Sequence, residues 1–156
     1  MDLELTGKRA LVTGSSSGIG AAAAKMLAAE GCEVMIHGRD MAKARGVVAE
    51  IADTGGTADV VTGDLATREG AEAVLAAVEA RWGGAVDILV NNAGGAAGSA
   101  KPWQDVDPET WIATYQMNVV GAARLIVRLL PGMIERGWGR VIQVGSASAT
   151  QPVSVL

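Results

Sequence analysis

The sequence contains one cysteine, one histidine, one tyrosine and no phenylalanine among its 156 residues. A single thiol, Cys32, cannot form an internal disulfide, which excludes a disulfide-stapled secreted domain and fits a reducing compartment. Because Cys32 precedes a predicted strand, we expect it to be buried and unreactive. The lone histidine, His37, lacks the partners that a metal site needs, so we predict no metal centre.

Long apolar runs and blocks of basic residues are also missing. No uninterrupted stretch of 18 apolar residues occurs, and residues 1–5 have neither the basic nor the apolar region of a signal peptide. We therefore expect a cytoplasmic protein with no membrane partner. The net charge is −4 and the arginines are scattered, so we expect no nucleic-acid partner either.

The residues that are present favour a tightly packed α/β protein. Hydrophobic residues make up 49% of the chain, and 21 residues are glycine, whereas aromatic residues contribute only 3%. A core built from Ala, Val and Gly residues suits close packing of helices on a sheet. The length suits a single domain over residues 1–156.

Apolar segments typical of strands alternate with segments of helical periodicity along the whole chain. Such alternation predicts a parallel sheet with right-handed crossovers, which is a Rossmann-type doubly wound α/β fold of about five strands with flanking helices. The predicted strands are 9–12, 33–37, 58–62, 86–90 and 140–144, and the predicted helices are 18–30, 41–52, 67–82 and a long one from Pro108. We expect Tyr115 on the packed face of that long helix.

A glycine-rich turn, Thr13–Gly20, separates the first predicted strand from the first predicted helix. Glycines allow close approach of a ligand, and the unpaired N–H groups of the first helical turn attract an anion. This setting predicts a cradle for the diphosphate of a dinucleotide. The absence of Lys-Ser or Lys-Thr after the glycines excludes a P-loop. The candidate cofactor-binding residues of this turn are Gly14, Ser16, Ser17, Gly18, Ile19 and Gly20.

Further polar or small residues follow the ends of the other predicted strands. They are Arg39, Asp64, the segment Asn91–Gly94 and Ser146. In an open doubly wound sheet the ligand binds outside the carboxyl ends of the strands, at the switch in strand order. These separate segments are therefore expected to meet in one crevice.

The same landmarks resemble those of the short-chain dehydrogenase/reductase family. The spacing G-x-x-x-G-x-G after Thr13 and the Asn-Asn-Ala-Gly sequence of Asn91–Gly94 carry the resemblance, together with the positions of Asp64, Asn118 and Ser146. It runs the length of the chain but covers only the N-terminal portion of a family member. The resemblance implies an oxidoreductase that transfers a hydride between a nicotinamide dinucleotide and a small-molecule carbonyl or alcohol.

The resemblance also implies roles for individual residues. Ser146 would orient the substrate oxygen, with Ser148 as a competing candidate, and Asn118 would support a proton relay. On the cofactor, Asp64 and Leu65 would line the adenine. The nicotinamide-ribose side would be lined by Asn91, Ala93 and Gly94. Thr13 would tie the first strand to the Asn91 region.

The family's catalytic Tyr-x-x-x-Lys pair has no counterpart within the 156 residues. Tyr115 is followed four positions later by Val119, and no lysine occurs after Lys101. We therefore expect an incomplete domain and no carbonyl reduction by this segment alone. A noncatalytic dinucleotide-binding or interaction domain stays open as the alternative.

The resemblance also implies what would surround this segment. The family adds strands beyond the fifth, which predicts that strand 140–144 is here an exposed apolar edge. The family's dimer interface includes the helix from Pro108, which implies a homo-oligomer. Residues 95–99 and 150–153 would form part of the substrate pocket wall.

The end of the second predicted strand bears on the choice of cofactor. Gly38 stands where NAD-using relatives commonly carry an aspartate, and the guanidinium of Arg39 can bind a 2′-phosphate. We therefore favour NADP(H) over NAD(H). Against this, Ser17 stands where many NADP-using relatives place a second basic residue. Asp40 could neutralise Arg39, and Arg39 could simply be solvated. We expect His37 at the end of this strand, beside the adenine ribose.

Overall fold

The computed structural model describes residues 3–95 and 103–147. Five strands form one parallel sheet in the order β3-β2-β1-β4-β5, which confirms the predicted Rossmann-type fold. The strands are β1 (Arg9–Val12), β2 (Glu33–Gly38), β3 (Thr57–Thr62), β4 (Ile88–Asn91) and β5 (Arg140–Gln143). The helices are α1 (Gly18–Ala29), α2 (Met41–Asp53), α3 (Arg68–Trp82), η1 (Trp103–Asp105), α4 (Pro108–Tyr115), η2 (Gln116–Val120) and α5 (Gly121–Glu135). Predicted ends lie within two residues of these, which is the usual uncertainty of helix and strand ends.

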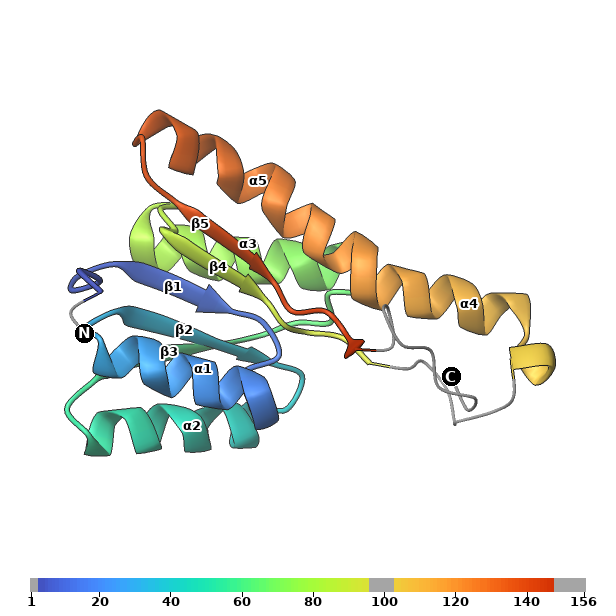
Figure 1. Cartoon of the computed structure of the whole chain (residues 1–156), viewed down its shortest axis with the longest axis horizontal. Helices are drawn as coiled ribbons and strands as arrows, with labels where there is room; N and C mark the ends of the chain where they lie inside the picture. Colours follow the sequence, from blue (N-terminus) through green and yellow to red (C-terminus); the bar gives the residue numbers. More distant parts are fainter. Residues whose placement is uncertain (1–2, 96–102, 148–156) are drawn as a thin grey trace.

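Helices cover both faces of the sheet (Figure 1). Helices α1 and α2 lie on one face, where small side chains such as Ala24 and Ala28 allow close packing on Val34 and Ile36. Helices α3 and α5 lie on the other face, where Val74 and Leu125 belong to a second buried cluster. The side chains of β1, β2 and β4 alternate between the two clusters, as the period of a strand requires.

The strand order reverses between β1 and β4, since the chain moves outward from β1 to β3 and then returns to the other side of β1. The strands all run parallel, and their arrows in Figure 1 point to the same edge of the sheet. This carboxyl edge is where a doubly wound sheet binds its ligand. The segments predicted to carry the site follow β1, β2, β3, β4 and β5 at that edge.

Helices α4, η2 and α5 form one continuous helical segment from Pro108 to Glu135, with a π-helical turn, η2, inside it. By length and composition this segment could cross a bilayer, a test that core helices of soluble proteins also pass. Residues Leu125, Leu129 and Met133 of α5 are buried against the sheet. The segment is therefore partly a core element, with an apolar outer face.

The prediction that Tyr115 lies on the packed face of its helix is wrong. Its side chain is 59% exposed, and α4 contains no buried residue. Figure 1 shows the reason, because α4 extends beyond the carboxyl edge of the sheet. Trp111 and Ile112 on the same helix are also exposed.

Strand β5 forms one edge of the sheet, as predicted. It pairs only with β4 among the described strands, and all its residues are exposed. Ile142 and Val144 leave large apolar surfaces on this edge. Unpaired N–H and C=O groups beside apolar side chains favour pairing with another strand.

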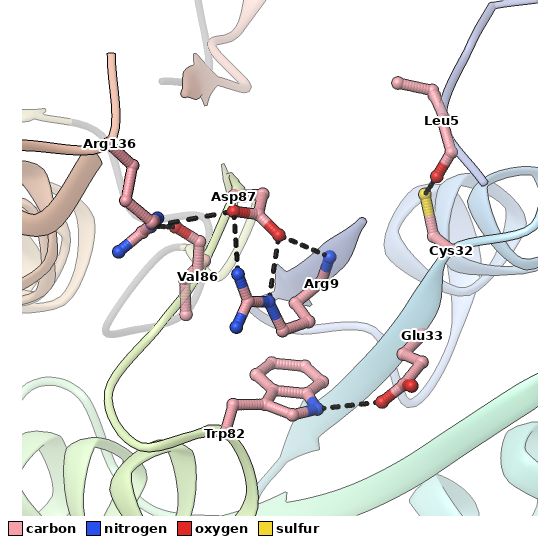
Figure 2. Close-up of polar contacts among 8 residues, drawn as sticks. All are labelled: Leu5, Arg9, Cys32, Glu33, Trp82, Val86, Asp87 and Arg136. Carbon is pink, nitrogen blue, oxygen red and sulfur yellow. Dashed lines mark hydrogen bonds and ion pairs between the residues drawn. The ribbon is translucent and has the colours of Figure 1, made fainter. Parts of the chain in front are cut away.

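A buried carboxylate, Asp87, lies where the strands begin, at the end of the sheet away from the carboxyl edge (Figure 2). Its Oδ2 accepts hydrogen bonds from the backbone N and the Nε of Arg9, each at 2.9 Å. Its Oδ1 accepts from Arg9 Nη2 at 3.2 Å and lies 3.6 Å from Arg136 Nη2. Arg136 also donates to the Val86 carbonyl. This cluster joins β1, β4 and the end of α5.

Near this cluster, Cys32 is buried and free, as predicted. Burial, followed by the charges of Asp87 and Glu30, raises the pKa of the thiol. A thiol that holds its proton is a poor nucleophile.

We expect Asp87→Asn to lower the free energy of unfolding at pH 7 by about 2 kcal/mol, because hydrogen bonds to charged groups are lost. Burial alone would raise the pKa of Asp87, but the hydrogen bonds and charge of Arg9, with the charge of Arg136, lower it overall. The unfolded carboxyl therefore takes up its proton first. The stabilisation is complete above about pH 4 and disappears as the pH falls through the lowered pKa. Urea unfolding from pH 7 to pH 3 measures this.

Asp53→Asn, at an exposed carboxylate, is the matched control and should change the stability little. Equal stability losses for Asp87→Asn and Asp53→Asn would contradict a structural role for the buried cluster.

Candidate cofactor site

The glycine-rich turn between β1 and α1 brings backbone into close contact with the loop after β4. Gly14 has φ +63°, and a methyl group added there would lie 2.8 Å from Ala93 Cα. A methyl group on Gly20 would lie 2.5 Å from the Gly14 carbonyl oxygen and from Asn92 Nδ2. These two glycines are therefore required by packing within the protein.

Gly18 differs, since it has φ +58° and a methyl group there would meet no atom within 4 Å. Ser17 precedes α1 at the N-cap position, but its side chain makes no capping hydrogen bond. Ile19, in the first turn of α1, is 71% exposed. The start of α1 thus presents uncapped N–H groups beside open space, which fits an anionic group such as a diphosphate.

Thr13 joins β1 to the loop after β4, the role that the resemblance implied. Its Oγ1 accepts hydrogen bonds from the backbone N of Asn92 and of Ala93, each at 2.9 Å, and donates to the Val90 carbonyl at 3.3 Å. The Asn92 side chain donates to the carbonyls of Thr13 and Gly14. The glycine-rich turn and the segment Asn91–Gly94 are therefore held together as one unit.

Asn91, at the carboxyl end of β4, is 5% exposed. Neither its Oδ1 nor its Nδ2 has a hydrogen-bond partner among the described residues. A buried amide without partners is costly, and such groups in folded proteins commonly bind a water or a ligand. The Asn91 amide is therefore a buried polar group at the carboxyl edge that could bind a ligand.

Asn118 lies within the π-helical turn η2 and is hydrogen-bonded to Gly95, which follows β4 and the segment Asn91–Gly94. Its Oδ1 accepts from Gly95 N at 2.9 Å, and its Nδ2 donates to the carbonyls of Gly95 and Thr114 at 2.8 and 2.7 Å. A methyl group on Gly94 would lie 2.5 Å from Asn118 Oδ1. The structure therefore brings Asn118 and Gly94 together.

The segment after β3 is held by a guanidinium from α5. Asp64 is exposed and accepts a hydrogen bond from Ala66 N, whereas Leu65 is buried. Arg124 Nη1 donates to the carbonyls of Leu65 and Ala66 at 3.0 and 3.1 Å, and its Nη2 donates to Gln116 Oε1. Asp64 thus projects from a backbone that α5 fixes.

The end of β2 places Gly38 against the glycine-rich turn. A methyl group on Gly38 would lie 2.6 Å from Ser16 Oγ and 2.8 Å from Ser16 Cβ, so a larger residue would push the turn aside. Arg39 follows and is exposed. Asp40 caps α2 by accepting from the backbone N of Ala42 and of Lys43. Within the described parts of the chain, no ion pair joins Asp40 to Arg39.

His37 lies near the end of β2, as expected from the sequence. Its ring is 3% exposed and hydrogen-bonded at both nitrogens, to Gly14 N and to the Gly63 carbonyl. The ring thus lies inside the protein, where β2 meets the glycine-rich turn. Ser146 follows β5 and is exposed. Ser148 and residues 96–99 and 150–153 lie outside the described residues.

Three residues that hold the site together, Ser15, His37 and Asn92, were not predicted to have this structural role, although Ser15 and Asn92 lie within the predicted segments Thr13–Gly20 and Asn91–Gly94. Ser15 is buried, its Oγ donates to the Val12 carbonyl and accepts from His37 N, and its backbone N donates to the His37 carbonyl. A polar residue in an otherwise apolar strand, such as His37, was the signal available for such a role.

Residues 8–156 match the short chain dehydrogenase family. The chain belongs to the short-chain dehydrogenase family. It is 40% identical over 159 residues to a fatty acyl-CoA reductase of Mycobacterium tuberculosis, with 99% of this chain and 52% of the relative covered. It is also 40% identical over 144 residues to a D-beta-hydroxybutyrate dehydrogenase of Cupriavidus necator, with 91% and 54% covered. The chain thus spans about half the length of the curated relatives it matches.

Solved structures of short-chain dehydrogenases share the fold over nearly the whole chain. The L-sorbose reductase of Gluconobacter frateurii, solved with NADPH and L-sorbose, has a TM-score of 0.91 and is 38% identical, with 98% of this chain and 57% of the reductase covered. A 3-oxoacyl (acyl-carrier-protein) reductase of Agrobacterium tumefaciens with NADP bound has a TM-score of 0.89 and is 36% identical, with 97% and 57% covered.

Proposed function

We propose that this chain is the cofactor-binding portion of an NADP(H)-preferring oxidoreductase that interconverts a carbonyl and an alcohol. The observation that carries the proposal is the uncapped start of α1 beside the open space at Gly18. The residues present fit a dinucleotide, since the diphosphate would lie against Gly18 and Ile19, and the buried Asn91 amide has no hydrogen-bond partner among the described residues. When bound, the nicotinamide supplies the hydride chemistry.

Support for NADP(H) over NAD(H) comes from the corner formed by β2 and the glycine-rich turn. Gly38 offers no carboxylate to a ribose 2′-OH and has no room for one beside Ser16. Arg39 is exposed next to it, and Asp40 is engaged in capping α2. Two relatives of known structure, the L-sorbose reductase and the 3-oxoacyl reductase, were solved with NADPH or NADP.

We expect Arg39→Asp to reverse the preference, weakening NADP⁺ binding at least tenfold while changing NAD⁺ binding much less, because a guanidinium–phosphate contact is replaced by repulsion. Titration calorimetry with both dinucleotides measures the ratio. Arg45→Asp makes the same charge change at an exposed arginine within α2 and should leave the ratio unchanged. An unchanged ratio in Arg39→Asp would show that Arg39 does not set the cofactor preference, and no binding of either dinucleotide to the parent chain would contradict the proposed function.

For the reaction itself, Ser146 is the proposed group that orients the substrate oxygen. The amide of Asn118 is engaged with Gly95 and Thr114, so its first role is to set the loop on the nicotinamide side. The 156 residues hold no Tyr-x-x-x-Lys pair. We therefore propose that this segment binds the dinucleotide without turnover, and that the whole protein acts as a homo-oligomer. The relatives named above are reductases or dehydrogenases, which favours an enzyme over a noncatalytic binding domain.

A further inference from the structure

The one histidine of the chain has a defined tautomer in this structure. The backbone N–H of Gly14 donates to His37 Nδ1 at 3.0 Å, so Nδ1 carries no proton. His37 Nε2 lies 3.0 Å from the Gly63 carbonyl oxygen, which can only accept, so Nε2 must carry the proton. The two contacts together require a neutral imidazole protonated at Nε2.

These contacts connect two parts of the cofactor site. Gly14 belongs to the glycine-rich turn, whose next residue, Ser15, exchanges backbone and side-chain hydrogen bonds with His37. Gly63 directly follows β3 and precedes Asp64. The imidazole therefore fixes the distance between the diphosphate cradle and the segment proposed to meet the adenine.

Protonation would break this connection. An imidazolium carries N–H groups at both nitrogens, so Nδ1–H would face the Gly14 N–H, and two donors repel each other. Burial lowers the pKa of His37, although the Gly63 hydrogen bond and the Asp64 charge partly raise it. The residues in contact from the glycine-rich turn, Gly14 and Ser15, carry no titratable side chain, so Asp64 is the charged group acting on the ring.

We propose that His37 is a positioning residue for dinucleotide binding: its neutral ring holds the glycine-rich turn against the end of β3, and a proton on the ring releases the turn. This inference rests on the proposed function. It makes cofactor affinity dependent on pH through a side chain that does not belong to the catalytic set of the reaction.

Because the chain has one histidine, its ¹⁵N imidazole resonances need no assignment. We expect the spectrum to show the Nε2–H tautomer, and the titration to fall below the ordinary pKa of about 6.5. Saturating NAD⁺ should lower that pKa further, since linkage is reciprocal. An Nδ1–H tautomer, or a titration that the dinucleotide leaves unmoved, would overturn the proposal without any variant.

The matched variant is His37→Asn, whose amide oxygen can accept from Gly14 N but does not titrate. NADP⁺ and NAD⁺ affinities are measured by calorimetry from pH 8.0 to pH 5.5, above the isoelectric point near 5.0. In the parent, affinity should fall by up to about tenfold per pH unit below the pKa of the imidazole. NAD⁺ is included because the 2′-phosphate of NADP⁺ itself titrates near pH 6.

We expect His37→Asn to bind NAD⁺ with an affinity that does not depend on pH, and within about tenfold of the parent at pH 8. The same pH profile in the parent and in His37→Asn would overturn the role of His37 while leaving the proposed function standing. Absence of dinucleotide binding at every pH would instead remove the proposed function.

Discussion

Gly20→Ala is expected to lower the free energy of unfolding by about 3 kcal/mol, the upper end of the usual cost of overpacking. The added methyl group would lie 2.5 Å from the Gly14 carbonyl oxygen and 2.9 Å from Ser15 Cα, and backbone cannot move aside cheaply. Urea unfolding in the absence of dinucleotide measures the loss, because the effect belongs to the protein alone.

Gly18→Ala separates packing from ligand binding in the same turn. Its methyl group meets nothing within 4 Å, so the cost is the strain of φ +58°, about 1 kcal/mol. Dinucleotide affinity should nevertheless fall at least tenfold, since the methyl group occupies the space left for the diphosphate. Gly46→Ala, in the open interior of α2, is the control and should stabilise the protein by about 0.5–1 kcal/mol.

Each of the two variants has an outcome that would contradict the description of the turn. A Gly20→Ala variant as stable as its parent would show that the turn does not pack as described. A Gly18→Ala variant that binds dinucleotide as well as the parent would place the diphosphate elsewhere.

Thr13→Val should also be strongly destabilising, by about 2–4 kcal/mol. Valine keeps the shape of threonine but leaves the backbone N–H groups of Asn92 and Ala93 without an acceptor in a buried place. Each unsatisfied group costs about 1–3 kcal/mol. Thermal and urea unfolding measure this, and loss of dinucleotide binding should accompany it because the loop after β4 is released.

Thr13→Ser is the rescue variant, as it keeps the hydroxyl and removes only a methyl group. We expect its stability to lie within about 1 kcal/mol of the parent. Equal losses in the serine and valine variants would mean that the methyl group, and not the hydroxyl, is what Thr13 contributes.

The fold could be predicted from the sequence because its strongest signals are periodic. Strand and helix segments alternate, crossovers are right-handed, and together these rules leave few topologies. They also place residues such as Arg39 and Asp64 at the same edge of the sheet before any coordinates exist. Boundaries were less certain, since β4 begins at Ile88 instead of Val86.

What could not be predicted depends on contacts between distant residues. The π-helical turn around Asn118 leaves no mark on an apolar pattern, and neither do the hydrogen bonds of the Asn118 amide with Thr114 and Gly95. Exposure of Tyr115 depends on how far α4 extends beyond the sheet, which periodicity does not report. Likewise, the hydrogen bonds of the His37 ring with Gly14 and Gly63 could not be predicted, because nothing local in the sequence reveals them.

The helical segment Pro108–Glu135 contacts two segments of the proposed dinucleotide site, the one after β3 and the one after β4. Arg124 donates hydrogen bonds to the backbone after β3, and Asn118 is hydrogen-bonded to the backbone after β4. A sideways shift of this helical segment would break both sets of hydrogen bonds together. The amide protons of the segments after β3 and β4 should therefore exchange with solvent as a single cooperative unit. Release of a dinucleotide bound at the proposed site would then depend on a helical segment whose α5 part packs on one face of the sheet.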